Sequence, residues 1–200
     1  MATTAITADQ VKKLRDATGA GMMAGTGAHT EANGDLEAAT TLLRKRGLAA
    51  ATKKAGRSTS EGLVGHYIHM GGKIGVLVEV NCESDFVART DKFQELTKEI
   101  AMHIAAANPT FVRREDVPAD LVAREREIYL DQVKDKPAQV IDKIVDGKLN
   151  SYYQQVCLMD QVSVRDPNVT ITQLVQDAIR ILGENIAVTR FVRMKVGESA

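Results

Sequence analysis

Hydrophobic residues at the start of the chain recur at helical spacing. Val11 and Leu14 share one helical face and follow residues 7–10, a capping box of Thr-Ala-Asp-Gln. In such a box the side chains of the first and last residues satisfy backbone groups that a helix start leaves free. Ile6 and Val11 have the spacing of a hydrophobic staple, and Gly19 is a typical helix stop. The pattern predicts a helix ending near Gly19.

A further helix is predicted after Asn33, with Gly47 as its C-terminal signal. Its apolar side is formed by four residues, Leu36, Ala39, Leu42 and Leu43. The intervening residues 21–32 must form a second helix or a compact loop. We therefore expect a small three-helix domain over residues 1–52, followed by a polar and basic linker over 53–60.

The pattern then changes to that of a β-hairpin. Two runs rich in β-formers, 63–70 and 74–80, flank a Gly-Gly-Lys turn at 71–73. In the second run the valines alternate, which places them on one face of the strand. They are Val76, Val78 and Val80.

The rest of the chain alternates between helical spacing and one late strand. A capping box and staple predict the helix at 170–183, and prolines or glycines mark the ends of the others. The predicted elements are a helix over 90–107, a helix after Pro118, a helix from Pro137 to Gly147, the helix at 170–183 and an alternating strand over 186–196. Together they predict an α+β core over residues 61–200.

Composition excludes several classes of protein. Lys plus Arg equals Asp plus Glu, at 26 each, whereas duplex-binding proteins usually carry a basic excess. The first residues lack a charged segment followed by an apolar run, and no apolar stretch approaches the ~20 residues that span a bilayer. Cys82 and Cys157 lack the spacing of a zinc or disulfide framework. We expect a cytoplasmic protein that binds neither DNA nor membranes.

The sequence offers little for covalent chemistry. It contains no phosphate-binding loop of the GxxxxGK[ST] type and no catalytic motif around its four histidines. His66 and His69 fall on opposite faces of a predicted strand, which makes them a poor ligand pair. We expect neither an enzyme nor a bound cofactor or metal.

His103 has two possible roles. It lies on the same side of its predicted helix as Leu96, Ile100 and Ala107. It is either a histidine at the edge of the core with its ring nitrogens satisfied, or one offered to a partner protein.

The loop at 81–89, Asn-Cys-Glu-Ser-Asp-Phe-Val-Ala-Arg, follows the hairpin directly. Exposed, Phe86 could fill a pocket of a partner while Asp85 fixes the register. Alternatively, Phe86 anchors the core and Asp85 caps the next helix. Physical reasoning alone leaves both readings open.

Several motifs together resemble the elongation factor Ts family. Residues 84–87, Ser-Asp-Phe-Val, resemble its Thr-Asp-Phe-Val signature, and similarity extends over nearly the whole chain. The other matching segments are 14–23 (Leu-Arg-Asp-Ala-Thr-Gly-Ala-Gly-Met-Met), 31–37, 43–47, 100–106, Gln161 with Asp166-Pro167, 183–186 (Gly-Glu-Asn-Ile) and 190–193.

The resemblance implies a fold and a function. The fold is α+β: a ubiquitin-associated-like three-helix N-terminal domain before a dimerisation-type α+β core. The implied function is nucleotide exchange on the GTPase elongation factor Tu, bound in its GDP-loaded and nucleotide-free states. The signature loop, here Ser84, Asp85, Phe86 and Val87, disturbs the Mg²⁺ site of the GTPase. Met22, Met23 and His103 are further candidate partner contacts.

One segment departs from the family pattern. After Met23 the family usually has an acid, a lysine pair and Ala-Leu, whereas residues 24–29 read Ala-Gly-Thr-Gly-Ala-His. Glycine costs a helix interior about 1 kcal/mol relative to alanine, so the second helix is less strongly predicted here.

Two expectations concern partners. Because longer relatives carry two similar halves in the core, one half alone would expose an apolar face, and we expect a homodimer. The alternative is a monomer whose own helices cover the sheet. The expected interface involves residues 152–159 and the last strand, and a disulfide between two copies through Cys157 is left open. The alternative function is an RNA- or ribosome-associated module that uses the basic linker residues Lys53, Lys54 and Arg57.

Overall fold

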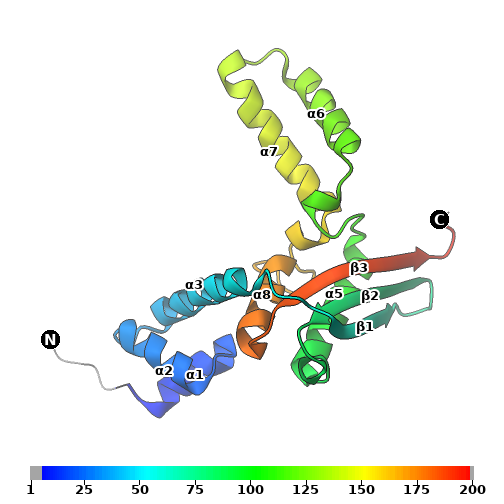
Figure 1. The fold of residues 1–200 in the computed structure, drawn as a ribbon. Coiled ribbons are helices and arrows are strands. Elements are labelled where there is room, and N and C mark those ends of the chain that lie inside the picture. Colours follow the sequence, from blue (N-terminus) through cyan, green and yellow to red (C-terminus); the bar gives the residue numbers. More distant parts are fainter. Residues whose placement is uncertain (1–5, 199–200) are drawn as a thin grey trace. The chain divides into compact units, whose positions relative to one another are not determined.

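The computed structural model describes residues 6–198, and its first part is a three-helix bundle (Figure 1). The helices are α1 (Ala8–Thr18), α2 (Met22–Glu31) and α3 (Leu36–Lys54). Thr7 and Gln10 form the predicted capping box of α1, and Gly19 ends that helix in the left-handed conformation, with a φ of 63°. The local signals for this helix are confirmed.

The bundle has a small aliphatic core, formed by Leu14, Ala20, Ala28, Ala39 and Leu43. The second helix forms in spite of its two glycines. A Cβ on Gly25 would lie 3.2 Å from Cγ of Arg15, so this glycine lets α1 and α2 approach closely.

The third helix continues past its predicted end. Gly47 lies inside α3, not at its C-terminus, and it is buried. A Cβ at this position would come within 2.8 Å of Cδ of Arg180. The absence of a side chain at Gly47 therefore makes room for Arg180, which lies far away in the sequence. The helix reaches Lys54, inside the expected linker, and Leu36 is exposed, contrary to its predicted place on the apolar side.

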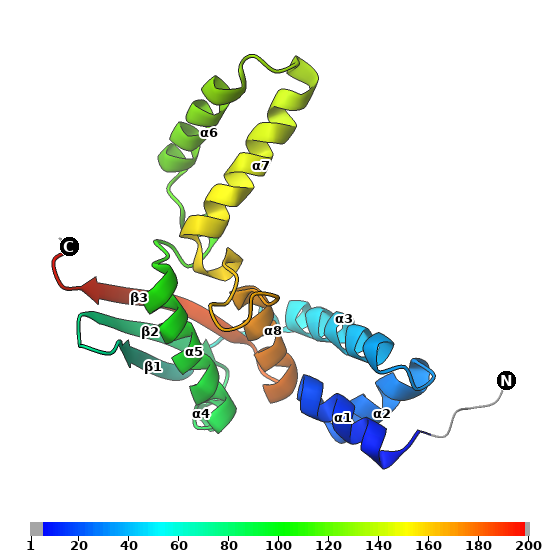
Figure 2. The same ribbon diagram turned by 180° about the vertical axis from the view of Figure 1, so that it is seen from behind.

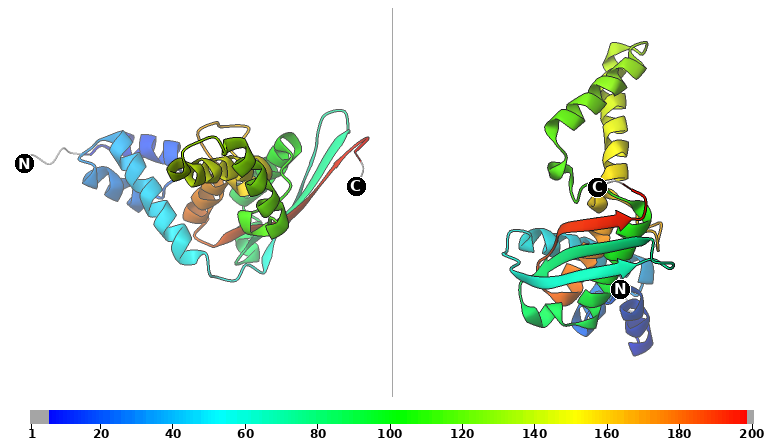
Figure 3. Two further views of the ribbon diagram at one scale, coloured as in Figure 1. Left: turned by 90° about the horizontal axis from the view of Figure 1, so that it is seen from above. Right: turned by 90° about the vertical axis from the view of Figure 1, so that its right-hand side faces the viewer.

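Three strands form one antiparallel sheet in the order β1-β2-β3. They are β1 (Glu61–Ile68), β2 (Ile74–Cys82) and β3 (Ile186–Lys195), seen side by side in the right-hand view of Figure 3. The predicted hairpin and late strand are confirmed, with Gly71 and Gly72 both at positive φ in the turn.

The inner face of the sheet is covered by α5 (Asp91–Ala107). Val76, Val78 and Val80 are buried on this face, as predicted. A Cβ on Gly65 of β1 would lie 2.2 Å from the Thr97 side chain of α5. Because no Cβ tolerates that distance, strand and helix can approach this closely only at a glycine.

The opposite, outer face of the sheet carries apolar side chains in the open. Val64, Ile68, Leu77, Val192 and Met194 are 53–72% exposed. Arg193 points the other way, because its Nε donates to the carbonyl oxygen of Ala105 in α5, 3.3 Å away. In β3 the predicted alternation does not hold over the whole strand: Ile186 and Val188 are buried, whereas Val192 and Met194 are exposed.

Two antiparallel helices, α6 (Ala119–Val133) and α7 (Ala138–Val156), form a helical hairpin (Figure 2). Its core contains Val133, Val145 and Leu149. The predicted stop at Gly147 is wrong, because α7 continues through it and packs Leu149 and Tyr153 on the same side. Burial of these side chains outweighs the cost of one exposed glycine.

The last helix, α8 (Ile171–Leu182), starts at its predicted capping box and ends before Gly183. It contacts the N-terminal bundle. The Arg180 guanidinium donates to the carbonyl oxygen of Thr18, and a Cβ on Gly19 would lie 2.9 Å from Cδ1 of Ile181.

Internal contacts divide the chain into two compact units. The first contains residues 6–63 with Asn81–Leu96 and Leu174–Ala187, and the second contains Val64–Val80, Thr97–Gln173 and residues 188–198. A separate domain at 1–52 and a linker at 53–60 stay predictions. None of the helices described here has the length and apolar composition that crossing a bilayer requires.

Candidate functional site

The loop after β2 forms a tight turn that leads into the four-residue helix α4 (Asp85–Ala88). Ser84 caps this turn, since its hydroxyl accepts a hydrogen bond from the Val87 N–H at 3.4 Å. Val87 is buried, whereas the Phe86 ring is 83% exposed. The turn therefore anchors itself through Val87 and places an aromatic ring in solvent.

The structure excludes the reading in which Phe86 anchors the core and Asp85 caps the next helix. Phe86 is not a core anchor, and the capping side chain is Ser84, not Asp85. Oδ2 of Asp85 instead accepts from Nη2 of Arg89 at 2.8 Å, in an exposed ion pair. An exposed carboxylate beside an exposed ring is the arrangement expected of a partner-recognition site.

A carboxylate from a distant part of the chain holds the backbone of this loop. Oε2 of Glu184 accepts from the N–H groups of Glu83 and Ser84, at 3.1 and 2.9 Å. Its Oε1 accepts from the Ser84 hydroxyl at 2.6 Å. All three donors belong to two consecutive residues, so one side chain fixes the start of the turn.

A second carboxylate, on the loop itself, accepts a hydrogen bond from the segment that carries Glu184. Oε1 of Glu83 accepts from the N–H of Asn185 at 2.6 Å, and Asn185 is itself buried, with its amide donating to the Arg57 carbonyl oxygen at 2.9 Å. Glu83 and Glu184 form what we call the carboxylate clamp. Glu184 lies in the segment 183–186 that resembles the family, but its motif alone predicts no role for it. The only local sign of such a role is an acid directly after a helix-ending glycine.

The linker basic residues are only partly free. Arg57 lies 3.5 Å from the Glu83 carboxylate, and its backbone is held by Asn185. Lys54 is half-buried at the end of α3, whereas Lys53 is exposed. The linker therefore offers less free positive charge than its sequence indicates.

Met22 and Met23 begin α2 and are 57% and 86% exposed. Sδ of Met22 lies 3.8 Å from Nη1 of Arg15. Both methionines are therefore accessible to a partner, as partner contacts must be.

His103 is not accessible. It is fully buried in α5, where its Nε2 lies 2.9 Å from Oε1 of Gln161 and its Nδ1 accepts from the Val164 N–H at 3.3 Å. The Nε2 atom therefore carries the proton. Burial lowers the pKa of His103, which favours the neutral ring. The expectation of a direct partner contact is corrected to that of an internal, satisfied histidine.

Both cysteines are free and buried. Burial, and next the Glu184 carboxylate, raise the pKa of Cys82. Burial raises the pKa of Cys157 to about 11. Because Cys157 has no exposed surface, a disulfide to a second copy would require the surrounding residues to move.

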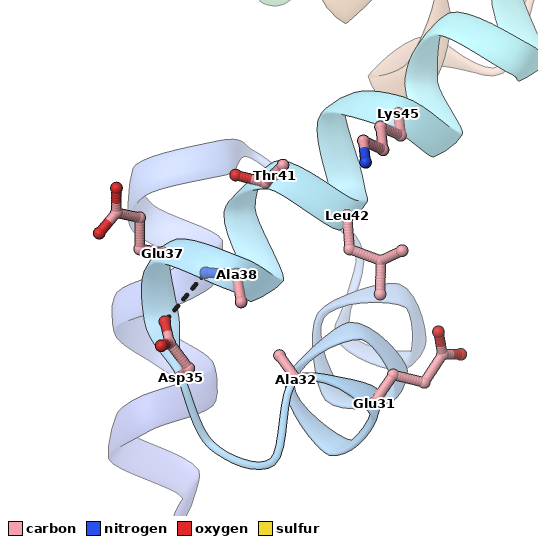
Figure 4. Close-up of a pocket in the computed structure, with 8 residues that line it drawn as sticks. All are labelled: Glu31, Ala32, Asp35, Glu37, Ala38, Thr41, Leu42 and Lys45. Atoms are coloured by element: carbon pink, nitrogen blue, oxygen red, sulfur yellow. Dashed lines mark hydrogen bonds between the residues drawn. The ribbon is translucent and has the colours of Figure 1, made fainter.

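A hollow of ≈ 610 Å³ lies where α2 leads into α3 (Figure 4). Three carboxylates line it, from Glu31, Asp35 and Glu37, together with Lys45. Two of them are already used. The Arg46 guanidinium donates to Oε1 of Glu31, and Oδ1 of Asp35 caps α3 by accepting from the Ala38 N–H at 2.9 Å. Within residues 6–198, no group of three or more His, Cys, Asp or Glu side chains is arranged to hold a metal ion.

Comparison with known proteins agrees with the motifs. A family model described as "Elongation factor TS" matches residues 37–198. A protein named elongation factor Ts from Fervidobacterium nodosum is 60% identical over 195 residues, which are 96% of this chain and 99% of that protein. Its namesakes from Geobacter sulfurreducens and Koribacter versatilis are each 57% identical over 96% of this chain, and over 90% and 89% of their own lengths. The chain belongs to the elongation factor Ts family.

Proposed function

We propose that this chain is a translation factor that binds the GTPase elongation factor Tu and promotes release of its GDP, without covalent chemistry of its own. Membership of the elongation factor Ts family supports the activity. The single structural observation behind the proposed site is the exposed Phe86 ring in the signature loop, next to the Asp85 carboxylate.

The proposed mechanism needs only differential binding. A Mg²⁺ ion bridges the nucleotide phosphates to a GTPase, so displacing the support of that ion weakens GDP binding. Phe86 inserts beside the site and Asp85 fixes the register, while Ser84 and Val87 hold the turn. Each tenfold faster release corresponds to about 1.4 kcal/mol of barrier lowering. At equilibrium the effect is mutual: the factor by which this chain lowers the affinity of the GTPase for GDP equals the factor by which GDP lowers its affinity for this chain.

The direct test is release of labelled GDP from elongation factor Tu in the presence of the chain. Acceleration at concentrations far below that of the GTPase is expected, because the factor leaves unchanged and acts again. No acceleration at stoichiometric concentration would refute the proposal.

Phe86→Ala tests the site. The ring is exposed, so we expect the free energy of unfolding to change by no more than about 0.5 kcal/mol, while GDP release slows at least about tenfold, as for a hot-spot aromatic. Val164→Ala removes part of a half-exposed apolar side chain outside the loop and should leave release unchanged. A large fall in the free energy of unfolding of Phe86→Ala, or an unchanged rate of GDP release, would contradict the proposed insertion of Phe86 into the GTPase.

We also propose that the chain forms a homodimer through the outer face of the sheet. Five apolar side chains on three adjacent strands are exposed there (Val64, Ile68, Leu77, Val192 and Met194). Monomers rarely expose contiguous apolar patches beyond a few hundred Å². Two such faces related by a twofold axis would pack as sheet on sheet and cover each other.

This interface differs in part from the one expected from sequence. The last strand contributes to it, as expected. In the segment 152–159, however, Cys157 and Leu158 are fully buried within the chain, so they are not available for a partner. The proposed dimer is therefore non-covalent.

A further inference from the structure

We propose that Glu184 is a positioning residue for nucleotide exchange, because its carboxylate fixes the backbone from which Phe86 projects. This inference rests on the proposed function and adds a residue that lies outside the signature loop.

The hydrogen bonds to Glu184 come from the start of the loop. Glu184 accepts from three donors, the N–H groups of Glu83 and Ser84 and the Ser84 hydroxyl. Those donors lie two and three residues before Phe86. Hydrogen bonds to a charged acceptor are stronger than bonds between neutral groups, so the backbone is fixed at the start of the loop.

Ser84 connects the carboxylate clamp to the residues on either side of Phe86. Its hydroxyl donates to Glu184 and accepts from the N–H of Val87. Val87, the residue after Phe86, is buried, and its carbonyl oxygen accepts from the Thr90 hydroxyl at 2.8 Å. One continuous set of hydrogen bonds therefore leads from Glu184 to both sides of the exposed ring.

The backbone that carries Glu184 is itself fixed by hydrogen bonds. Asn185, the neighbour of Glu184, is buried and bonded to Glu83 and Arg57. The clamp thus links two loops about a hundred residues apart in sequence. An inserting side chain such as Phe86 loses less conformational entropy on binding when its loop is preorganised than when its loop is mobile.

The experiment combines GDP release with backbone hydrogen exchange in the full-length chain. In Glu184→Ala we expect the Glu83 and Ser84 amides to exchange at least about tenfold faster, since their acceptor is gone. The maximal rate of GDP release should fall at least about tenfold, although Phe86 is still present. Glu198→Gln is the matched control, because Glu198 is an exposed acid bonded to Lys195 and Arg193. It should change neither quantity.

A double variant separates positioning from general destabilisation. If Glu184 acts through Phe86, then adding Glu184→Ala to Phe86→Ala should slow release by less than about twofold further, since coupled residues are not additive. Full additivity would overturn the inference. Should Glu184→Ala not fold, Glu184→Gln keeps one acceptor oxygen and should give an intermediate loss of release.

The two proposals fail in different ways. If the unaltered chain does not accelerate GDP release, the proposed function is wrong, and the positioning role is wrong with it. If release depends on Phe86 but not on Glu184, while the Ser84 amide is freed, only the positioning role is wrong.

Discussion

Two histidines are buried in this chain, and they differ in how their ring nitrogens are satisfied. His103 has a partner at each nitrogen. His29, on α2, is 1% exposed, and neither of its nitrogens has a hydrogen-bond partner. The second arrangement is costly, because a buried polar atom without a partner loses its bond to water and gains none.

His29→Leu should therefore stabilise the protein. Removing two unsatisfied polar atoms from an apolar site is expected to raise the free energy of unfolding by about 1–3 kcal/mol, measured by chemical denaturation. Thr30→Leu, on the exposed side of the same helix, controls for helix propensity and should change stability by no more than about 0.5 kcal/mol. Equal effects of the two variants would show that burial at position 29 is not the cause.

His103 should make stability depend on pH in one direction. Its pKa is lowered in the folded state by burial, so the unfolded chain binds a proton more readily. Stability is then lost as pH falls below the unfolded pKa of about 6.5. We expect His103→Gln to reduce the loss between pH 7.5 and 5.5, measured by denaturation at each pH. An unchanged pH dependence would contradict this assignment.

At the scale of elements, two helices continue through glycines that were predicted to end them. Gly147 lies inside α7 with no atom of another residue near its missing Cβ, whereas Gly47 lies inside α3 against Arg180. Gly147→Ala should stabilise the fold by about 0.5–1 kcal/mol, the intrinsic helix preference of alanine. Gly47→Ala gains the same preference but must displace Arg180, and it should not stabilise. Thermal unfolding of both variants checks this, and equal stabilisation would contradict the packing role of Gly47.

These glycines also show what the sequence could predict. The starts of α1 and α8 were predictable because Thr7 and Thr170 bond to residues only three positions away. The ends at Gly47 and Gly147 were not, since the apolar contacts that continue each helix come from elsewhere in the chain. The same limit applies to the site. The loop motif identified Phe86, whereas Glu184 acts across about a hundred residues and the burial of His103 depends on Gln161.

At the scale of the whole molecule, the outer sheet face makes assembly testable. Light scattering under reducing conditions should give twice the chain mass of 21.7 kDa at micromolar concentration. Val192→Glu should shift the mass to that of the monomer, because it places a charge within the proposed apolar interface. Val164→Glu, outside the sheet, should remain dimeric. A monomeric mass for the unaltered chain would refute the dimer.

The two buried thiols have a practical consequence. Cys82 lies in the first compact unit and Cys157 in the second, and these are the only cysteines in the chain. Because both thiols are buried and both pKa values are raised, alkylating reagents can reach them only when the surrounding residues open. Mass spectrometry of alkylated peptides should therefore give two labelling rates, one for the opening of each unit, in a single sample of the unmodified protein.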